Sequence, residues 1–266
     1  MAQMFAYVCS DDSLSGELLE GRHGEALRGV EAEERAGLGL AWAQGGRTLV
    51  RKQPGKRASG LDVAALVGDV RSRAVVGHVR ALSEGRVPTG VLQPFRAGSW
   101  LWAQEGFGLV SEEVYGALRE GVPEHLRQRL GGRALAEVMF LRAYAEMDHA
   151  WKRSAKQERW RGTAAAMAQA LETSSRVLRG AEPSDELWRG AAVAARDRGL
   201  IALALGEALN VCVIEGLEPP TDQRLRERVE QVARERFRAV LLTSGPSPGA
   251  EWERLMPGQA LWVEES

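Results

Sequence analysis

The chain begins with MAQMFAYVCS (1–10), a stretch that predicts a buried strand starting almost at the first residue. Residues 4–9 alternate weakly and include Phe5, Tyr7 and Val8, which are side chains typical of strands. Chain termini usually fray unless other structure holds them. A strand this close to the N-terminus therefore indicates that the start of the chain is tied into a sheet.

Further strands are expected along the first 110 residues. GLGLAWAQGGRTLVRK (37–52) predicts a hairpin, because Gly45 and Gly46 are both free to take the positive φ that its turn requires. SRAVVGHVRA (72–81) and GSWLWAQEG (98–106) predict two more strands, separated by a loop that contains glycine and proline.

From Ser111, a predicted helix cap, the pattern becomes helical and is expected to stay so to about residue 205. This includes an Ala-rich helix over 163–180 and another over 183–199, capped by Ser184. Strands at 210–216, 238–244 and 260–265 and a helix at 221–237 follow. With strands at both ends and helices between them, residues 1–266 are predicted to form one α+β domain whose termini share a sheet.

Composition excludes several classes of protein. The 266 residues carry a formal net charge of -1 and are 44% hydrophobic, which indicates a globular protein without a general nucleic-acid or membrane footprint. Cys9 and Cys212 both lie in apolar stretches, so we expect them to pack in the core, with no disulfide framework and no metal site. No signal peptide or membrane span is recognisable, and we expect a cytoplasmic protein without a cofactor.

Several segments, in order, resemble the class II glutamine amidotransferases of the N-terminal nucleophile hydrolase superfamily. The matching segments span nearly the whole chain: MAQMFAYVCS, GLGLAW, GHVRALSEG, LQPFRAGSWLWAQEG, GRALAEVMF and TSGPSPGAEWERLMPGQALWVEE. The resemblance implies a four-layer α/β/β/α sandwich. It also implies a site where an N-terminal cysteine attacks the amide of glutamine.

The groups that this chemistry needs are only partly present. Ala2 stands at the position of the nucleophilic cysteine, and Glu105 replaces the asparagine that, with Gly106, forms the oxyanion hole. Arg80 keeps the arginine that pairs with the substrate carboxylate, whereas Arg133 stands where an aspartate holds the ammonium. A carboxylate facing an oxyanion and a guanidinium facing an ammonium are both repulsive, so glutamine hydrolysis is not expected.

Three functions follow as hypotheses. The first is a catalytically inactive scaffold or regulatory protein with a protein partner. The second is a sensor in which Arg80 and Arg133 bind a carboxylate or phosphate, and the third is an enzyme rebuilt around Glu105 as an acid or base. We expect Glu105 to pair with Arg133 or Arg80 and fill the vestigial pocket, which favours the scaffold. The sequence specifies neither the partner nor the oligomeric state.

Two basic stretches and one histidine complete the candidates. RTLVRKQPGKR (47–57) and WKRSAKQERWR (151–161) contain the cations, and the second also the aromatics, of a nucleic-acid surface. The acidic balance favours solvated surfaces instead, with Trp151 and Trp160 packing a helix onto the sandwich or onto another protein. His78 is expected to be a structural histidine with satisfied hydrogen bonds rather than a ligand or an acid/base group.

Overall fold

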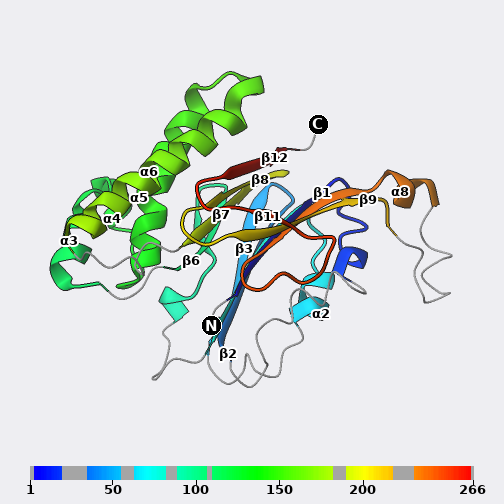
Figure 1. The fold of residues 1–266 in the computed structure, drawn as a ribbon, viewed down its shortest axis with the longest axis horizontal. Helices are drawn as coiled ribbons and strands as arrows, with labels where there is room; N and C mark the ends of the chain where they lie inside the picture. Colours follow the sequence, from blue (N-terminus) through cyan, green and yellow to red (C-terminus); the bar gives the residue numbers. More distant parts are fainter. Residues whose placement is uncertain are drawn as a thin grey trace.

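A computed structural model describes residues 3–19, 35–54, 63–81, 89–106, 110–181, 190–217 and 231–264. Its strands form two antiparallel sheets packed face to face, and helices cover both outer faces (Figure 1). This arrangement is the four-layer α/β/β/α sandwich predicted from the sequence.

The larger sheet has seven strands in the order β11-β9-β10-β1-β4-β2-β3. Its first strand, β1, lies in the middle, between β4 and β10, so the start of the chain is held on both sides as expected. The bounds are β1 Gln3–Cys9, β2 Arg35–Gln44, β3 Arg47–Pro54, β4 Ala74–Ala81, β9 Leu209–Glu215, β10 Arg238–Thr243 and β11 Glu253–Leu255.

The smaller sheet has five strands in the order β12-β8-β7-β6-β5. It takes β12 from the end of the chain and the rest from two hairpins, β5–β6 and β7–β8. The bounds are β5 Phe95–Ala97, β6 Trp100–Glu105, β7 Ala191–Arg196, β8 Gly199–Ala204 and β12 Ala260–Glu264.

Helices α3 to α6 cover the smaller sheet. The first of them is capped by Ser111, as predicted, because the Ser111 hydroxyl accepts the Val114 N–H at 3.3 Å. Shorter helices cover the larger sheet. The bounds are η1 Glu17–Leu19, α2 Val63–Gly68, η5 Thr89–Val91, α3 Glu112–Glu120, α4 Glu124–Arg127, α5 Leu135–Arg153, η6 Lys156–Glu158, α6 Arg159–Ala181 and α8 Gln231–Arg236.

Strand alternation distributes the apolar side chains over three cores. On β1, Met4 and Ala6 face the other sheet, whereas Phe5 and Tyr7 face the short helices. The ring of Phe5 lies against Gly77 of β4, where an added Cβ would come within 2.0 Å of the ring. The glycine in VVGHV is therefore fixed by packing between adjacent strands.

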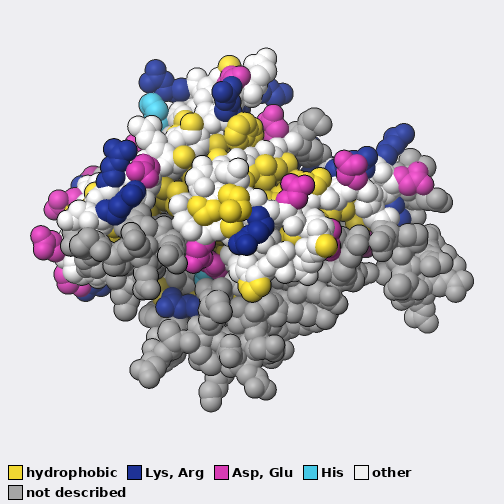
Figure 2. Space-filling model, viewed as in Figure 1, with side chains coloured by type: hydrophobic (Ala, Val, Ile, Leu, Met, Phe, Trp, Pro, Cys, Tyr) yellow, Lys and Arg dark blue, Asp and Glu magenta, His cyan; other side chains and the backbone are white. Residues whose placement is uncertain are grey.

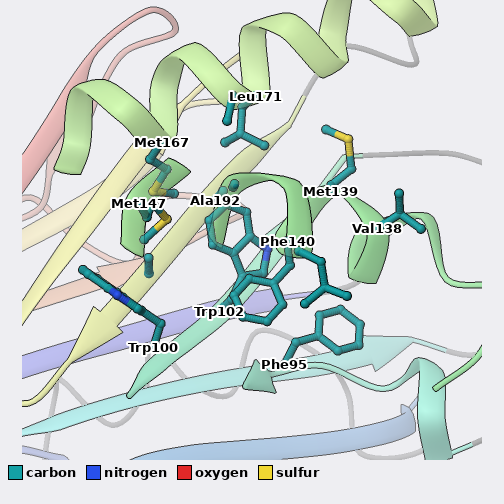
Figure 3. Close-up of a cluster of buried hydrophobic side chains, with 14 of the residues drawn as sticks. Phe95, Trp100, Trp102, Val138, Met139, Phe140, Met147, Met167, Leu171 and Ala192 are labelled. Atoms are coloured by element: carbon teal, nitrogen blue, oxygen red, sulfur yellow. The ribbon is translucent and has the colours of Figure 1, made fainter. Parts of the chain in front are cut away.

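The third core lies between the smaller sheet and the long helices α5 and α6 (Figure 3). Trp100 and Trp102 of β6 are fully buried here, and Trp102 contacts Phe140 of α5 with ring centroids 5.5 Å apart. Trp151 and Trp160 pack edge-on against Trp100 at 5.4 and 5.8 Å. The prediction that these two tryptophans pack a helix onto the sandwich is confirmed.

The predicted helix over 183–199 is wrong, because residues 191–196 and 199–204 form the hairpin β7–β8. Nearly every residue of the two strands is buried, since one face contacts the other sheet and the opposite face contacts the helices. Full burial removes the polar alternation that marks a strand, and the alanines alone suggest a helix. Asp197, with a φ of 50°, forms the turn.

Other expectations are met in part. Strands β9, β10 and β12 lie where they were predicted, and β5 and β11, of three residues each, were not foreseen. In the predicted helix at 221–237, α8 occupies 231–236, and 221–230 lie outside the described residues. Within the described part of the chain, no helix is long and apolar enough to span a membrane.

Candidate functional site

Three ionisable side chains face the space between the two sheets near one of its ends. On β4, His78 and Arg80 share the alternation of Val76, which faces the other sheet. On β6, Glu105 lies two residues after Ala103, which faces the other sheet, so Glu105 faces the other sheet as well. This is also the end where β1 starts, because the first residue pairs of β1 with β4 include Met4 with His78.

The start of β1 is fixed by the residue that follows β10. The Met4 N–H donates to the Ser244 hydroxyl at 2.8 Å, and the Ser244 N–H donates to the Met4 carbonyl at 2.9 Å. Beside them, the Gln3 amide donates to the Thr243 hydroxyl at 3.1 Å. Ala2, the position of the family's nucleophile, lies outside the described residues.

Sequence reasoning missed Ser244 and the residue that supports its turn. The side-chain amide of Asn210 donates to the carbonyls of Gly245 and Pro246 at 3.0 and 3.2 Å, which fixes the chain just beyond Ser244. The signal was available, since TSGPSPG (243–249) is one of the segments that carry the family resemblance. Its role in holding the first strand was not evident from sequence.

Glu105 is the chemically unusual member of the group. Burial, with a smaller contribution from Glu207, raises the pKa of its carboxyl to about 7, although hydrogen bonding by Ser244 and by the backbone of Met4 acts to lower it. Its Oε1 is buried and has no hydrogen-bond partner among the described residues. The next residue, Gly106, has a φ of 85° and turns the chain away from the sheet.

His78 is buried and neutral at physiological pH. Burial and, to a smaller extent, the positive charge of Arg80 lower the pKa of its imidazole to about 4. Its Nδ1 has no hydrogen-bond partner. The expectation of a structural histidine fits the burial, but the expectation that its hydrogen bonds are satisfied is wrong.

Arg80 lies on the same face of β4, with its side chain half-buried. Within the described part of the chain, its guanidinium makes no ion pair and no hydrogen bond, so the expected salt bridge to Glu105 is not formed. Arg80 is thus a cation at the edge of the site without a counter-ion.

Arg133 points elsewhere. Its guanidinium pairs with the Glu112 carboxylate of α3 and lies over the Tyr115 ring, 5.5 Å from the centroid. The side chain is 65% exposed. The predicted pair between Arg133 and Glu105 is therefore wrong. A solvated carboxylate on the helical layer lets the guanidinium keep its water, whereas reaching Glu105 means desolvating both charges.

Glu137, in the segment GRALAEVMF (132–140), has a structural role that the sequence did not reveal. Both of its carboxylate oxygens accept the Gly131 N–H, at 3.1 and 3.0 Å, which fixes the loop before α5. Burial raises the pKa of this carboxyl, whereas these hydrogen bonds and the charge of Lys52 lower it.

The two cysteines are core residues, as expected. Cys9 and Cys212 are both free and buried. Burial raises the pKa of the Cys9 thiol to about 12, so no thiolate forms there at neutral pH. Among the described residues, no group of His, Cys, Asp and Glu is arranged to hold a metal ion.

The basic stretches are partly accounted for by packing. In 47–57, residues 47–54 form β3, on which Lys52 is half-buried over the Phe95 ring at 5.1 Å, and 55–57 lie outside the described residues. In 151–161, Trp160 is 8% exposed, so its faces are not available for base stacking. Binding of nucleic acid is otherwise untested.

No protein-family model matches the sequence, and no curated protein matches it either. Solved structures do share its fold. A glutamine aminotransferase class-II domain protein from Silicibacter pomeroyi has a TM-score of 0.58 at 17% identity, covering 98% of this chain and 94% of that one. A predicted glutamine amidotransferase from Pseudomonas aeruginosa PA01 has a TM-score of 0.51 at 13% identity, covering 99% and 96%.

A third similar structure is the allosteric regulatory enzyme of purine biosynthesis, with a TM-score of 0.56 and 14% identity. The match covers 99% of this chain but 47% of that enzyme, so this chain corresponds to about half of it. The protein therefore has the fold of class-II glutamine amidotransferase domains, at identities that establish the fold alone.

Proposed function

We propose that this protein is a glutamine amidotransferase-like pseudoenzyme, which does not hydrolyse glutamine and acts as a scaffold or regulatory partner of another protein. The observation that carries the proposal is Glu105. Its carboxyl, with an unpartnered oxygen, lies beside the start of β1, where the family resemblance places the asparagine of the oxyanion hole.

The energetics of that position argue against amide hydrolysis. An oxyanion-hole donor contributes about 3 kcal/mol to the transition state. A carboxylate about 4 Å from a developing oxyanion instead repels it by roughly 4 kcal/mol at an effective dielectric near 20. With Ala2 in place of the cysteine and Arg133 paired on the helical layer, three groups of the family mechanism are missing together.

The direct test is release of ammonia from L-glutamine by the full chain, from acid to alkaline pH, against a heat-inactivated control. We expect no release above the control. Release that is abolished by Glu105→Gln contradicts the proposal and favours the enzyme rebuilt around Glu105, whose pKa of about 7 suits an acid or base.

A second candidate is the sensor, supported by the unpaired guanidinium of Arg80. A carboxylate or phosphate ligand supplies the counter-ion that Arg80 lacks within the described chain. Arg133 is the matched control, because it is an arginine already paired with Glu112.

The sensor and the scaffold differ in whether Arg80 is needed for binding of a small anion. If the protein is a sensor, binding of glutamate or inorganic phosphate, measured by calorimetry, is lost in Arg80→Ala and kept in Arg133→Ala. If it is a scaffold, neither compound binds, and capture of the partner protein is unchanged in both variants.

A further inference from the structure

The four edge strands of the two sheets differ in how well they are protected from pairing with another chain. In the larger sheet, edge strand β11 has three residues and carries Glu253 and Arg254, and edge strand β3 carries the exposed Arg47 and Arg51. In the smaller sheet, edge strand β5 also has three residues. Short strands and charges are the usual means of preventing an edge from pairing with another chain.

The fourth edge strand, β12, is longer than three residues and carries no charged side chain over residues 260–263. It is the five-residue strand ALWVE (260–264), with no proline or lysine and its one charge, Glu264, at the end. Trp262, in the middle, is 44% exposed. Figure 2 shows apolar side chains gathered on this face, over the region where Figure 1 places β9, β11 and β12.

The apolar surface continues from the edge onto the larger sheet. Val213 of β9 is 64% exposed, and Met256, between β11 and β12, is 50% exposed. Leu261 and Val263 of β12 are only partly buried against the inter-sheet core. An exposed apolar surface bordering an unprotected strand edge is typical of a protein contact.

Among the described strands, none pairs with the outer edge of β12, so its backbone is available for pairing. The Gln259 carbonyl accepts the Ala204 N–H at 3.1 Å, so residue 259 bonds toward β8. By alternation, the N–H and C=O groups of Ala260, Trp262 and Glu264 point to the free edge. A second strand can therefore bond to all three residues.

We propose that β12 is the interface of a homodimer, in which the β12 strands of two copies pair antiparallel about a two-fold axis at Trp262. The five-stranded sheets of the two copies then form one continuous sheet. Only the N–H and C=O groups that already face outward are used, giving about six new backbone hydrogen bonds.

The sequence of β12 favours a second copy over an unrelated strand, because it is complementary to itself in this register. Trp262 lies opposite its own copy and Leu261 lies opposite Val263, so apolar side chains meet on both faces. Ala260 lies opposite Glu264, which keeps the two glutamates at opposite ends without like-charge contact. A two-fold axis also closes the assembly and leaves no free β12 edge.

The first test is the mass of the full chain by analytical ultracentrifugation. We expect a dimer, twice the 29.0 kDa of the monomer. Trp262→Lys places two cations opposite each other and is expected to raise the dissociation constant by about 30-fold or more, as for loss of a central tryptophan. Leu49→Lys, at a 37% exposed apolar residue of β3, is the matched control and leaves the dimer intact.

The second test reports the register and does not depend on the lysine variant folding. Residues at the two-fold axis have Cα atoms about 5.5 Å apart, within disulfide range. Trp262→Cys is therefore expected to cross-link to its copy under mild oxidation. Ala260→Cys is not, because the two copies of residue 260 lie more than about 13 Å apart. Cys9 and Cys212 are buried and contribute little background.

A chain that stays monomeric at high micromolar concentration overturns the proposal and leaves the edge to a strand of another protein. A dimer that survives Trp262→Lys unchanged also overturns it, because the interface then lies elsewhere. Equal cross-linking at positions 260 and 262 contradicts the two-fold register.

Discussion

The two faces of β6 carry different buried polar groups, the amide of Gln104 on the helix side and the carboxyl of Glu105 on the inter-sheet side. Gln104 faces the helices, where its side chain accepts the Trp102 indole N–H at 2.8 Å and its backbone exchanges two hydrogen bonds with the Gln93 amide, at 2.8 and 2.7 Å. Glu105, the next residue, faces the other sheet, and within the described part of the chain its Oε1 has no hydrogen-bond partner. Among the described residues, the Gln104 Nε2 on the helix side also lacks a hydrogen-bond partner, so the two faces differ in the kind of group they bury: a neutral amide on the helix side and an ionisable carboxyl on the inter-sheet side.

The largest effect is expected on the helix side. Trp102→Ala removes a fully buried indole that packs on Phe140, and we expect the free energy of unfolding to fall by about 3–5 kcal/mol. Denaturant unfolding at neutral pH measures this. Trp42→Ala, at a half-buried tryptophan of β2, is the control and should lose clearly less. Equal losses in the two variants contradict the assignment of this core as the main source of stability.

Glu105 is expected to make the protein less stable as the pH rises. Its pKa is about 7 in the folded protein and 4.5 ordinarily, so the folded state binds more protons between these values and stability falls through that window. The loss is about 3 kcal/mol at most. Glu105→Gln, which stays neutral, should therefore be more stable than the wild type above pH 7 and similar to it below pH 4.5. A difference that does not change with pH contradicts the shifted pKa.

His78 is expected to have the opposite effect on the pH dependence of the free energy of unfolding. Its pKa is about 4 in the folded protein and 6.5 ordinarily, so the unfolded state binds more protons between these values and stability rises with pH. In the wild type this rise and the fall caused by Glu105 overlap and largely cancel. His78→Gln should uncover a stability that falls with pH, and Glu105→Gln one that rises. Identical pH profiles of unfolding in the two variants refute this account.

The four-layer sandwich was expected from the family resemblance. The sequence pattern itself predicts most of the strands, because they alternate and their turns carry recognisable signals, such as Gly45 and Gly46, whose φ values are 58° and 73°. It fails at β7 and β8, where burial on both faces leaves Ala-rich runs without alternation. Local pattern and tertiary context conflict there, and tertiary context prevails.

In the candidate site, too, some side chains have directions that the sequence predicts and others do not. Glu105 and Arg80 both face the space between the two sheets, because strand register fixes the direction of a side chain. Arg133 precedes α5 in a loop, and its direction depends on Glu112, a residue far from it in sequence. No local pattern identifies that partner.

Arg133→Ala tests whether the two regions are independent. The pair with Glu112 is exposed, so we expect the free energy of unfolding to change by less than about 1 kcal/mol. The pH dependence attributed to Glu105 should not change, because Arg133 does not reach that carboxyl. A shift of the Glu105 titration, followed by carboxyl-carbon NMR, indicates instead that the two groups pair in solution.

The smallest effect is expected where sequence reasoning began. Ala2→Cys restores the thiol of the family's nucleophile, and mass spectrometry of the intact chain verifies that the initiator methionine is removed so that the cysteine carries the free amine. We nevertheless expect no ammonia release from L-glutamine above pH 7, where the Glu105 carboxyl is mostly ionised. A thiolate that attacks an amide still has to stabilise the resulting oxyanion, and loss of one donor costs about 10²- to 10³-fold in kcat even without a repelling charge. Substantial turnover by this single variant contradicts the proposed effect of Glu105, because a repelling carboxylate then does not lie beside the oxyanion.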